Sequence, residues 1–204
     1  MTMRRSGSSA NSTDRRPAAP NAVRITGGTL RGRMVLVPKK ARPTEGRVRE
    51  ALFSMWQEQL PGARVLDLFA GSGIVALEAI SRGALAATCL EGDLAAVRLL
   101  ETNCRKLAPG AVEVRRVTLP SGLTDFAAVR VGQYDLIFAD PPYQLLAYDK
   151  LIAAVHPLLA HHGELVIEHS SRSGLPEEAS GLIQTDRRRY GESCLSFFRV
   201  AQAA

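Results

Sequence analysis

The chain has 204 residues and a net charge of +6, and 46% of its residues are hydrophobic. These values are typical of one globular domain with a substantial core. No run approaches the ~20 apolar residues that a membrane-spanning helix needs, which excludes an integral membrane protein. The charge is uneven, because residues 1–50 hold 12 basic and 3 acidic side chains whereas the rest of the chain is slightly acidic. A basic front of this kind predicts an element that binds a polyanion.

Cysteine usage and the N-terminal composition both bear on where the protein works. The three cysteines are widely spaced and show no metal-ligand spacing with the four histidines. This usage is typical of a reducing compartment, so we expect a cytoplasmic protein with neither a disulfide nor a bound metal. Residues 1–22 are rich in Arg, Ser, Ala and Pro and lack the apolar region of a secretory signal. We expect this segment to be a disordered basic tail.

Residues 23–60 have the pattern of a small hairpin–helix extension. Two β-type runs, 23–25 and 34–37, flank a segment with three glycines, which predicts a hairpin. A helix is expected next, because apolar residues recur there at helical spacing, namely Val48, Leu52, Trp56 and Leu60. We expect Arg47 and Arg49 on the opposite, exposed face of this helix.

Residues 61–204 alternate between strand and helix patterns, which predicts a Rossmann-like α/β sheet, mostly parallel, with helices on both faces. Strands are expected at 65–69, 86–91, 112–117, 134–139 and 164–168. Helices are expected up to about residue 81, at 93–107 and at 148–159. Two further β-type runs surround a Tyr-Gly-Glu turn and predict an antiparallel C-terminal hairpin, at 182–189 and 193–201.

A glycine turn follows the first of these strands, in the segment Asp67-Leu68-Phe69-Ala70-Gly71-Ser72-Gly73. Glycines at such a turn let a nucleotide approach the main chain at a helix N-terminus, although a purely structural turn is an alternative. Asp67 favours S-adenosylmethionine over a dinucleotide, since a carboxylate attracts a positive amino-acid moiety and repels a pyrophosphate. Glu91 ends the next strand, where an acid can accept hydrogen bonds from ribose hydroxyls. We therefore assign the donor to Asp67, Glu91 and the turn residues Phe69, Ala70, Gly71, Ser72 and Gly73.

A second motif, Asp140-Pro141-Pro142-Tyr143, directly follows the strand 134–139. An exocyclic amino group on a base is a poor nucleophile because its lone pair is delocalised into the ring. Asp140 and the main-chain carbonyl of Pro141 can accept its two hydrogens, while Pro142 helps to fix the backbone that aims the carbonyl. Tyr143 offers a ring on which an extruded base can stack. The motif predicts methyl transfer to an amino group at the same sheet edge as the glycine turn.

Together these segments resemble the RsmD family of bacterial 16S rRNA guanine-N2 methyltransferases, which have the class I, S-adenosylmethionine-dependent fold. The resemblance covers residue 23 to about residue 200, in Arg24-Ile25-Thr26-Gly27-Gly28, Arg42-Pro43-Thr44, Arg47-Val48-Arg49-Glu50, both site motifs and Tyr190-Gly191. It implies methylation of the N2 amino group of one guanine in small-subunit rRNA. It also implies an adenine contact after the third strand, which here falls on Thr118. We expect an in-line transfer with no covalent enzyme intermediate and no metal.

The basic residues of the extension are the candidate contacts to RNA phosphates, namely Arg24, Arg31, Arg33, Arg42, Arg47 and Arg49. The expected partner is 16S rRNA within the small ribosomal subunit, with no membrane association. The sequence leaves the oligomeric state open, with a monomer as the default expectation. Two alternatives stay open: a DNA amino methyltransferase acting on adenine or cytosine, and a catalytically silent ribosome-assembly protein that binds RNA.

Overall fold

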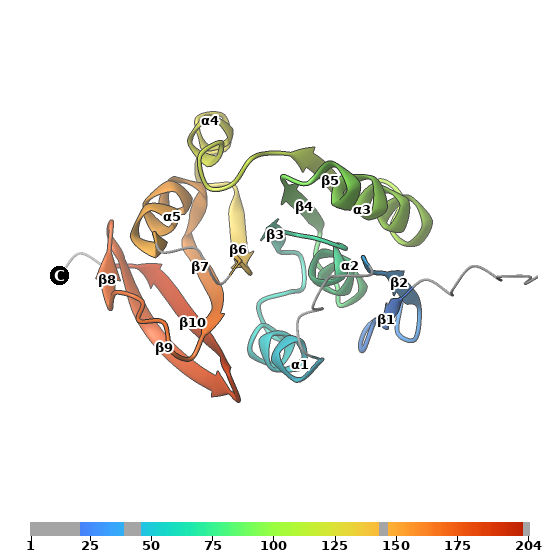
Figure 1. The fold of residues 1–204 in the computed structure, drawn as a ribbon, viewed down its shortest axis with the longest axis horizontal. Helices are drawn as coiled ribbons and strands as arrows, with labels where there is room; N and C mark the ends of the chain where they lie inside the picture. The colour runs from blue at the N-terminus through green and yellow to red at the C-terminus, as the bar shows by residue number, and fades with distance from the viewer. Residues whose placement is uncertain (1–20, 39–45, 143–146, 202–204) are drawn as a thin grey trace, which may run out of the picture.

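The computed structural model describes residues 21–38, 46–142 and 147–201 (Figure 1). The predictions about residues 1–20 of the N-terminal tail, about Arg42 and about Tyr143 concern residues that lie outside these ranges. The predicted end of the tail at residue 22 is wrong, because Ala22 already belongs to strand β1 (Ala22–Arg24). An eight-stranded sheet has the order β5-β4-β3-β6-β7-β10-β9-β8. Its strands are β3 (Arg64–Leu68), β4 (Ala86–Glu91), β5 (Val112–Arg116), β6 (Tyr134–Ala139), β7 (Leu159–Ser170), β8 (Glu178–Ala179), β9 (Leu182–Tyr190) and β10 (Ser193–Val200).

The direction of the strands confirms the predicted fold class. Strands β3 to β7 pair in parallel, whereas β10 is antiparallel to β7 and to β9, and β8 is antiparallel to β9. The inner strands are apolar along most of their length because a sheet with helices on both faces buries both sides of each strand. The antiparallel strands β9 and β10 form the C-terminal hairpin that the sequence predicts.

Helices cover both faces of the sheet, and the sheet separates the core into two apolar clusters. On one face, α1 (Gly46–Met55), α2 (Ile74–Ser81) and α3 (Leu94–Leu107) supply the first cluster, which includes Leu52, Leu77 and Leu100. On the other face, α4 (Leu123–Ala127) and α5 (Tyr148–Val155) supply the second cluster, with Leu123 and Ile152. Figure 1 shows α4 and α5 grouped on one side, away from α1 and α2.

The chain between α5 and β7 differs from the prediction. The helix expected at 148–159 ends at Val155, and a 3₁₀ turn, η1 (His156–Leu158), follows it. Pro157 accounts for this early end, because proline lacks the N–H that a continuing α-helix would use. Strand β7 accordingly begins at Leu159, five residues before the start expected at residue 164.

The N-terminal hairpin of β1 (Ala22–Arg24) and β2 (Met34–Leu36) forms a separate two-stranded antiparallel sheet, in which Val23 is paired with Val35. Its buried residues Ile25 and Val35 belong to the same apolar cluster as α1 and α2. Trp56, just after α1, is fully buried and donates from Nε1 to Oε2 of Glu164 in β7 at 3.0 Å. The hairpin and α1 are therefore packed onto the sheet and share its core.

Candidate active site

The glycine turn between β3 and α2 has a backbone that most side chains do not tolerate. Phe69, Gly71 and Gly73 have positive φ angles of 59°, 53° and 76°. Gly73 is also the N-cap of α2, and a Cβ atom there would lie 2.2 Å from Cδ1 of Leu100. A positive φ at a residue other than glycine, such as Phe69, costs energy and is found mostly at functional sites. The turn thus has a constrained backbone at the N-terminus of α2, where the glycines let a ligand approach the main chain closely.

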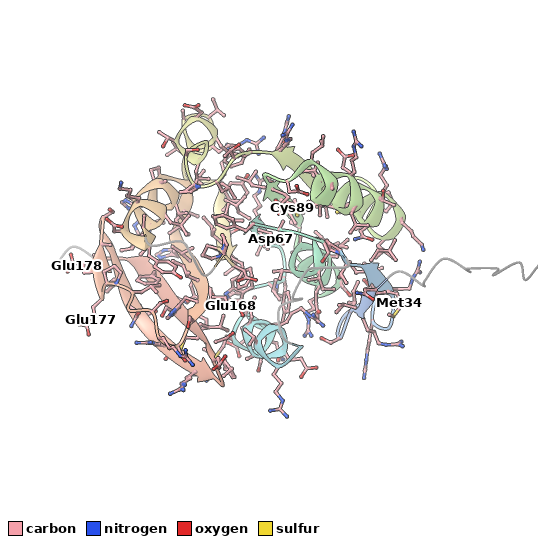
Figure 2. The ribbon with its side chains drawn as sticks, viewed as in Figure 1. Met34, Asp67, Cys89, Glu168, Glu177 and Glu178 are labelled. Atoms are coloured by element: carbon pink, nitrogen blue, oxygen red, sulfur yellow. The ribbon has the colours of Figure 1, made fainter. Side chains whose placement is uncertain are left out.

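Asp67 lies at the carboxyl end of β3, beside Cys89 of β4, and is 2% exposed (Figure 2). Its Oδ2 accepts a hydrogen bond from the N–H of Ala76 at 3.3 Å. The pKa of Asp67 is raised to about 8, chiefly by burial and also by the negative charges of Asp140 and Glu91, against the lowering effect of that hydrogen bond. The three carboxyl groups that the sequence assigned to the site are thus close enough to repel one another.

Glu91 ends β4 and is held by three backbone N–H groups. Its Oε2 accepts from Gly71 at 2.9 Å, and its Oε1 accepts from Gly92 at 2.7 Å and from Asp93 at 2.9 Å. Thr118 is exposed, and its Cα would lie 3.7 Å from a Cβ placed on Gly92. The carboxylate, the glycine turn and Thr118 therefore line one edge of the sheet.

Asp140 follows β6 directly, beside the end of β3. Leu68 is paired with Ala139 across these two parallel strands, so Asp140 leaves the sheet next to Phe69. Side chains alternate along a strand, and Phe138 packs into the cluster of α1 and α2, so Asp140 is directed toward that same face. Pro141 is buried and Pro142 is exposed. The two sequence motifs come together as expected, except that Tyr143 lies outside the described residues.

The basic residues of the extension fall into two groups. Arg24, Arg31, Arg33 and Arg47 are exposed. The prediction that Arg49 is exposed and contacts RNA is wrong, because Arg49 is 2% exposed, its Nε lies 2.9 Å from Oε2 of Glu78, and its Nη2 donates to the carbonyl of Arg24. The cause is helical geometry. At 100° a residue, position 49 falls between positions 52 and 53 on the buried arc of α1.

Two buried polar residues received no role in the sequence interpretation. Glu78 of α2 is fully buried and accepts hydrogen bonds from Arg49, from Arg82 and from the hydroxyl of Thr26. It joins α1, α2 and the segment after β1. Asn103 of α3 is 2% exposed and occupies an apolar-periodic position between buried leucines. A polar residue in an otherwise apolar helical stripe is the signal that could have identified both.

Comparisons with known proteins decide the family. The family described as conserved hypothetical protein 95 matches residues 23–199. The chain belongs to this family. Ribosomal RNA small subunit methyltransferase D of Escherichia coli (strain K12) is 35% identical over 158 residues, which cover 76% of this chain and 78% of that protein. The family resemblance that the motifs indicate is thereby confirmed.

Further relatives align with this chain over most of its length. Ribosomal RNA small subunit methyltransferase D of Haemophilus influenzae is 34% identical over 141 residues, covering 67% of this chain and 72% of that protein. The solved structure of a hypothetical protein from Thermus thermophilus is 37% identical and superposes with a TM-score of 0.75, covering 87% of this chain and 99% of its own. The shared fold therefore covers most of this chain.

The cysteines of this family member are poor nucleophiles. Cys89, Cys104 and Cys194 are buried and free. Burial raises the pKa of Cys104 to about 12 and holds that of Cys89 well above its usual value. Because the thiolate is the reactive form, both thiols are poorly suited to covalent attack on a base near neutral pH. Among the described residues, no group of three or more His, Cys, Asp or Glu could hold a metal ion, and no helix is long and apolar enough to cross a membrane.

Proposed function

We propose that the protein transfers a methyl group from S-adenosylmethionine to the N2 amino group of a guanine in 16S rRNA of the small ribosomal subunit. The observation that carries the proposal is the meeting of Asp67, Glu91 and Asp140 at one end of the sheet. It occurs in a chain similar to proteins named ribosomal RNA small subunit methyltransferase D. The choice of guanine N2 rests on the resemblance to the RsmD family. We place the reaction in the cytoplasm, with the protein acting as a monomer.

The carboxylates and the glycine turn fit S-adenosylmethionine, which supplies an activated methyl group when bound. The three backbone N–H groups hold the Glu91 carboxylate in place, and its remaining lone pairs can accept from the two ribose hydroxyls. Asp67 would hold the positive amino group of the methionyl part, and pairing with it would favour the ionised carboxylate. Thr118 would contact the adenine. Gly71 lets the main chain approach the ligand closely.

Asp140 and the carbonyl of Pro141 act on the guanine. They accept the two hydrogens of the amino group, which turns the nitrogen lone pair toward the methyl carbon. A nitrogen–carbon bond forms as the carbon–sulfur bond breaks, and one proton leaves the nitrogen toward Asp140 or water. Pro142 keeps the carbonyl aimed, and Tyr143 stacks on the base at about 1–3 kcal/mol.

The exposed arginines hold the rRNA. Arg24, Arg31 and Arg33 lie on the hairpin and Arg47 lies on α1, and all four are exposed. Each can neutralise one phosphate, which makes binding sensitive to salt. Arg42 completes the set as a proposal from the sequence alone. Arg49 is not proposed as an RNA contact, because its side chain is buried and forms an ion pair with Glu78.

Substitution of Asp140 tests the assignment of the reacting edge. Asp140→Ala should lower methyl transfer to undermethylated small subunits at least about 100-fold, since it removes an acceptor for the reacting amino group. It should not weaken the affinity for S-adenosylhomocysteine, because the charge of Asp140 repels Asp67 and is not needed to hold the donor. Asp135→Ala is the matched control, since Asp135 is exposed at the opposite end of the same strand. If Asp140→Ala loses methyl transfer only because it no longer binds S-adenosylhomocysteine, the role assigned to Asp140 is contradicted.

A further inference from the structure

Asn103 connects two parts of the protein that are far apart in sequence. Its Oδ1 accepts from the N–H of Leu36 at 3.1 Å, and its Nδ2 donates to the carbonyl of Leu36 at 2.9 Å. The same Nδ2 donates to the carbonyl of Ser72 at 2.9 Å. One buried side chain on α3 thus holds β2 of the hairpin and the glycine turn of the candidate donor site.

The contact with Leu36 resembles pairing with a further strand. The N–H of Val37 donates to the carbonyl of Asn21, so the backbone groups of Val37 point toward the strand β1 side of the hairpin. Successive residues of a strand direct their N–H and carbonyl groups to alternate sides, so those of Leu36 point away from β1. Asn103 satisfies both of them with one amide. Without it the N–H and the carbonyl of Leu36 would be partly buried without these partners, which is unfavourable. The outer edge of the hairpin is therefore fixed to α3 at this point.

The contact with Ser72 holds the turn at a second point, besides the one held by Glu91. Ser72 lies between Gly71 and Gly73, the two glycines with positive φ. Glu91 holds the N–H of Gly71, while Asn103 holds the carbonyl of Ser72. A turn rich in glycine has much conformational freedom to lose, so these two bonds hold it in the conformation that a ligand would meet.

We propose that Asn103 is a positioning residue that couples donor binding to rRNA binding, so that each ligand strengthens the other. The proposal rests on the proposed function, because it requires the hairpin arginines to hold rRNA. With rRNA on Arg24, Arg31 and Arg33, the hairpin stays in place, and Leu36 keeps Asn103 against Ser72. By thermodynamic reciprocity, a donor that orders the turn must favour rRNA binding by the same factor. Coupling factors between two such sites are about 5 to 150.

The test measures this coupling directly by equilibrium dialysis of labelled S-adenosylhomocysteine, with and without saturating undermethylated small ribosomal subunits. The wild-type protein should bind S-adenosylhomocysteine about tenfold more tightly when the subunits are present. Asn103→Ala should bind it more weakly without subunits and should show no tightening when they are added. Asn103→Asp keeps the volume of the side chain but places an oxygen against the carbonyls of Leu36 and Ser72, and should behave like Asn103→Ala.

Two control variants separate this role from general loosening. Ser81→Ala removes a hydroxyl that holds the hairpin at its other end, through the carbonyl of Gly27 at 2.5 Å and the N–H of Leu30 at 2.8 Å. It should weaken subunit binding but leave S-adenosylhomocysteine binding and its tightening at saturation unchanged. Thr102→Ala changes the residue before Asn103, whose hydroxyl bonds only its own helix at Arg98 among the described residues, and should match the wild type.

The outcomes distinguish this inference from the function on which it rests. A wild-type protein that binds both ligands without any tightening overturns the coupling and leaves the proposed function standing. Asn103→Ala with unchanged tightening also overturns it, as does Ser81→Ala with the same loss of donor binding as Asn103→Ala. A wild-type protein that binds neither S-adenosylhomocysteine nor small subunits overturns both proposals.

Discussion

Burial should keep a proton on Asp67 in the ligand-free protein near neutral pH, and donor binding should remove it. Burial and neighbouring carboxylates raise the pKa of Asp67 from 3.8 to about 8. At pH 7 a group with that pKa holds about 0.9 proton. A positive amino group beside the carboxylate favours the ionised form, so binding should release close to one proton at pH 7. The affinity should then rise by up to about tenfold for each pH unit between pH 6 and 8.

Calorimetry measures this release. Binding of S-adenosylhomocysteine at pH 7, in buffers that differ in ionisation enthalpy, gives the number of protons that leave the protein. Asp67→Asn is the matched variant, because it has nearly the same shape and can still accept from Ala76, yet it cannot ionise. It should bind S-adenosylhomocysteine more weakly and release no proton. The reasoning about Asp67 is refuted if the wild type releases none, or if Asp67→Asn releases as many as the wild type.

The same pKa determines the sign of the pH dependence of stability. The folded protein binds one more proton than the unfolded chain between pH 3.8 and about 8, so the free energy of unfolding falls as the pH rises through this window. The contribution of Asp67 is complete below pH 4 and is lost above pH 8. Asp67→Asn should therefore be more stable than the wild type at pH 8, and the difference between the two denaturant curves should shrink steadily as the pH falls toward 4. A constant difference across this range would contradict the raised pKa.

Three further changes have definite expected results. Glu78→Gln leaves two arginines without their carboxylate and should lower the free energy of unfolding by about 3 kcal/mol in urea; a loss under 1 kcal/mol would show that the network is not stabilising. Gly73→Ala places a Cβ atom 2.2 Å from Cδ1 of Leu100, at a residue with a positive φ. It should therefore abolish S-adenosylhomocysteine binding measured by dialysis. Wild-type affinity in this variant would show that donor binding does not depend on the observed conformation of the turn. The double change of Arg31 and Arg33 to Ala should flatten the salt dependence of rRNA binding by about two phosphate contacts, and an unchanged slope would place the RNA elsewhere.

The sheet could be predicted because its strands carry strong local signals. Each parallel strand is a short, mostly apolar run that a covered sheet needs, and the observed bounds of β4 (Ala86–Glu91) and β6 (Tyr134–Ala139) equal the predicted ones. Where two neighbouring signals compete, the prediction fails. The sequence pattern predicts a helix that continues past Val155 to residue 159, but Pro157 ends the helix early.

The site could be predicted in outline for a topological reason. Asp67, Glu91 and Asp140 each lie at or just after the carboxyl end of a parallel strand, so strand pairing alone brings them to one edge. What could not be predicted depends on tertiary contacts. Helical spacing places Arg49 on the buried arc of α1, but its partner Glu78 lies 29 residues away and no local pattern identifies it. Asn103 likewise has no local motif, because its partners are 31 and 67 residues away.

The most direct test of the proposed function is the identity of the methylated polymer. Purified protein and labelled S-adenosylmethionine are incubated separately with undermethylated small ribosomal subunits, with free 16S rRNA and with DNA, and the labelled product is digested to nucleosides. We expect label in small-subunit rRNA, recovered as N2-methylguanosine, with none in DNA and none for Asp140→Ala. Label in DNA alone, or no label in any of the three, would contradict the proposed function.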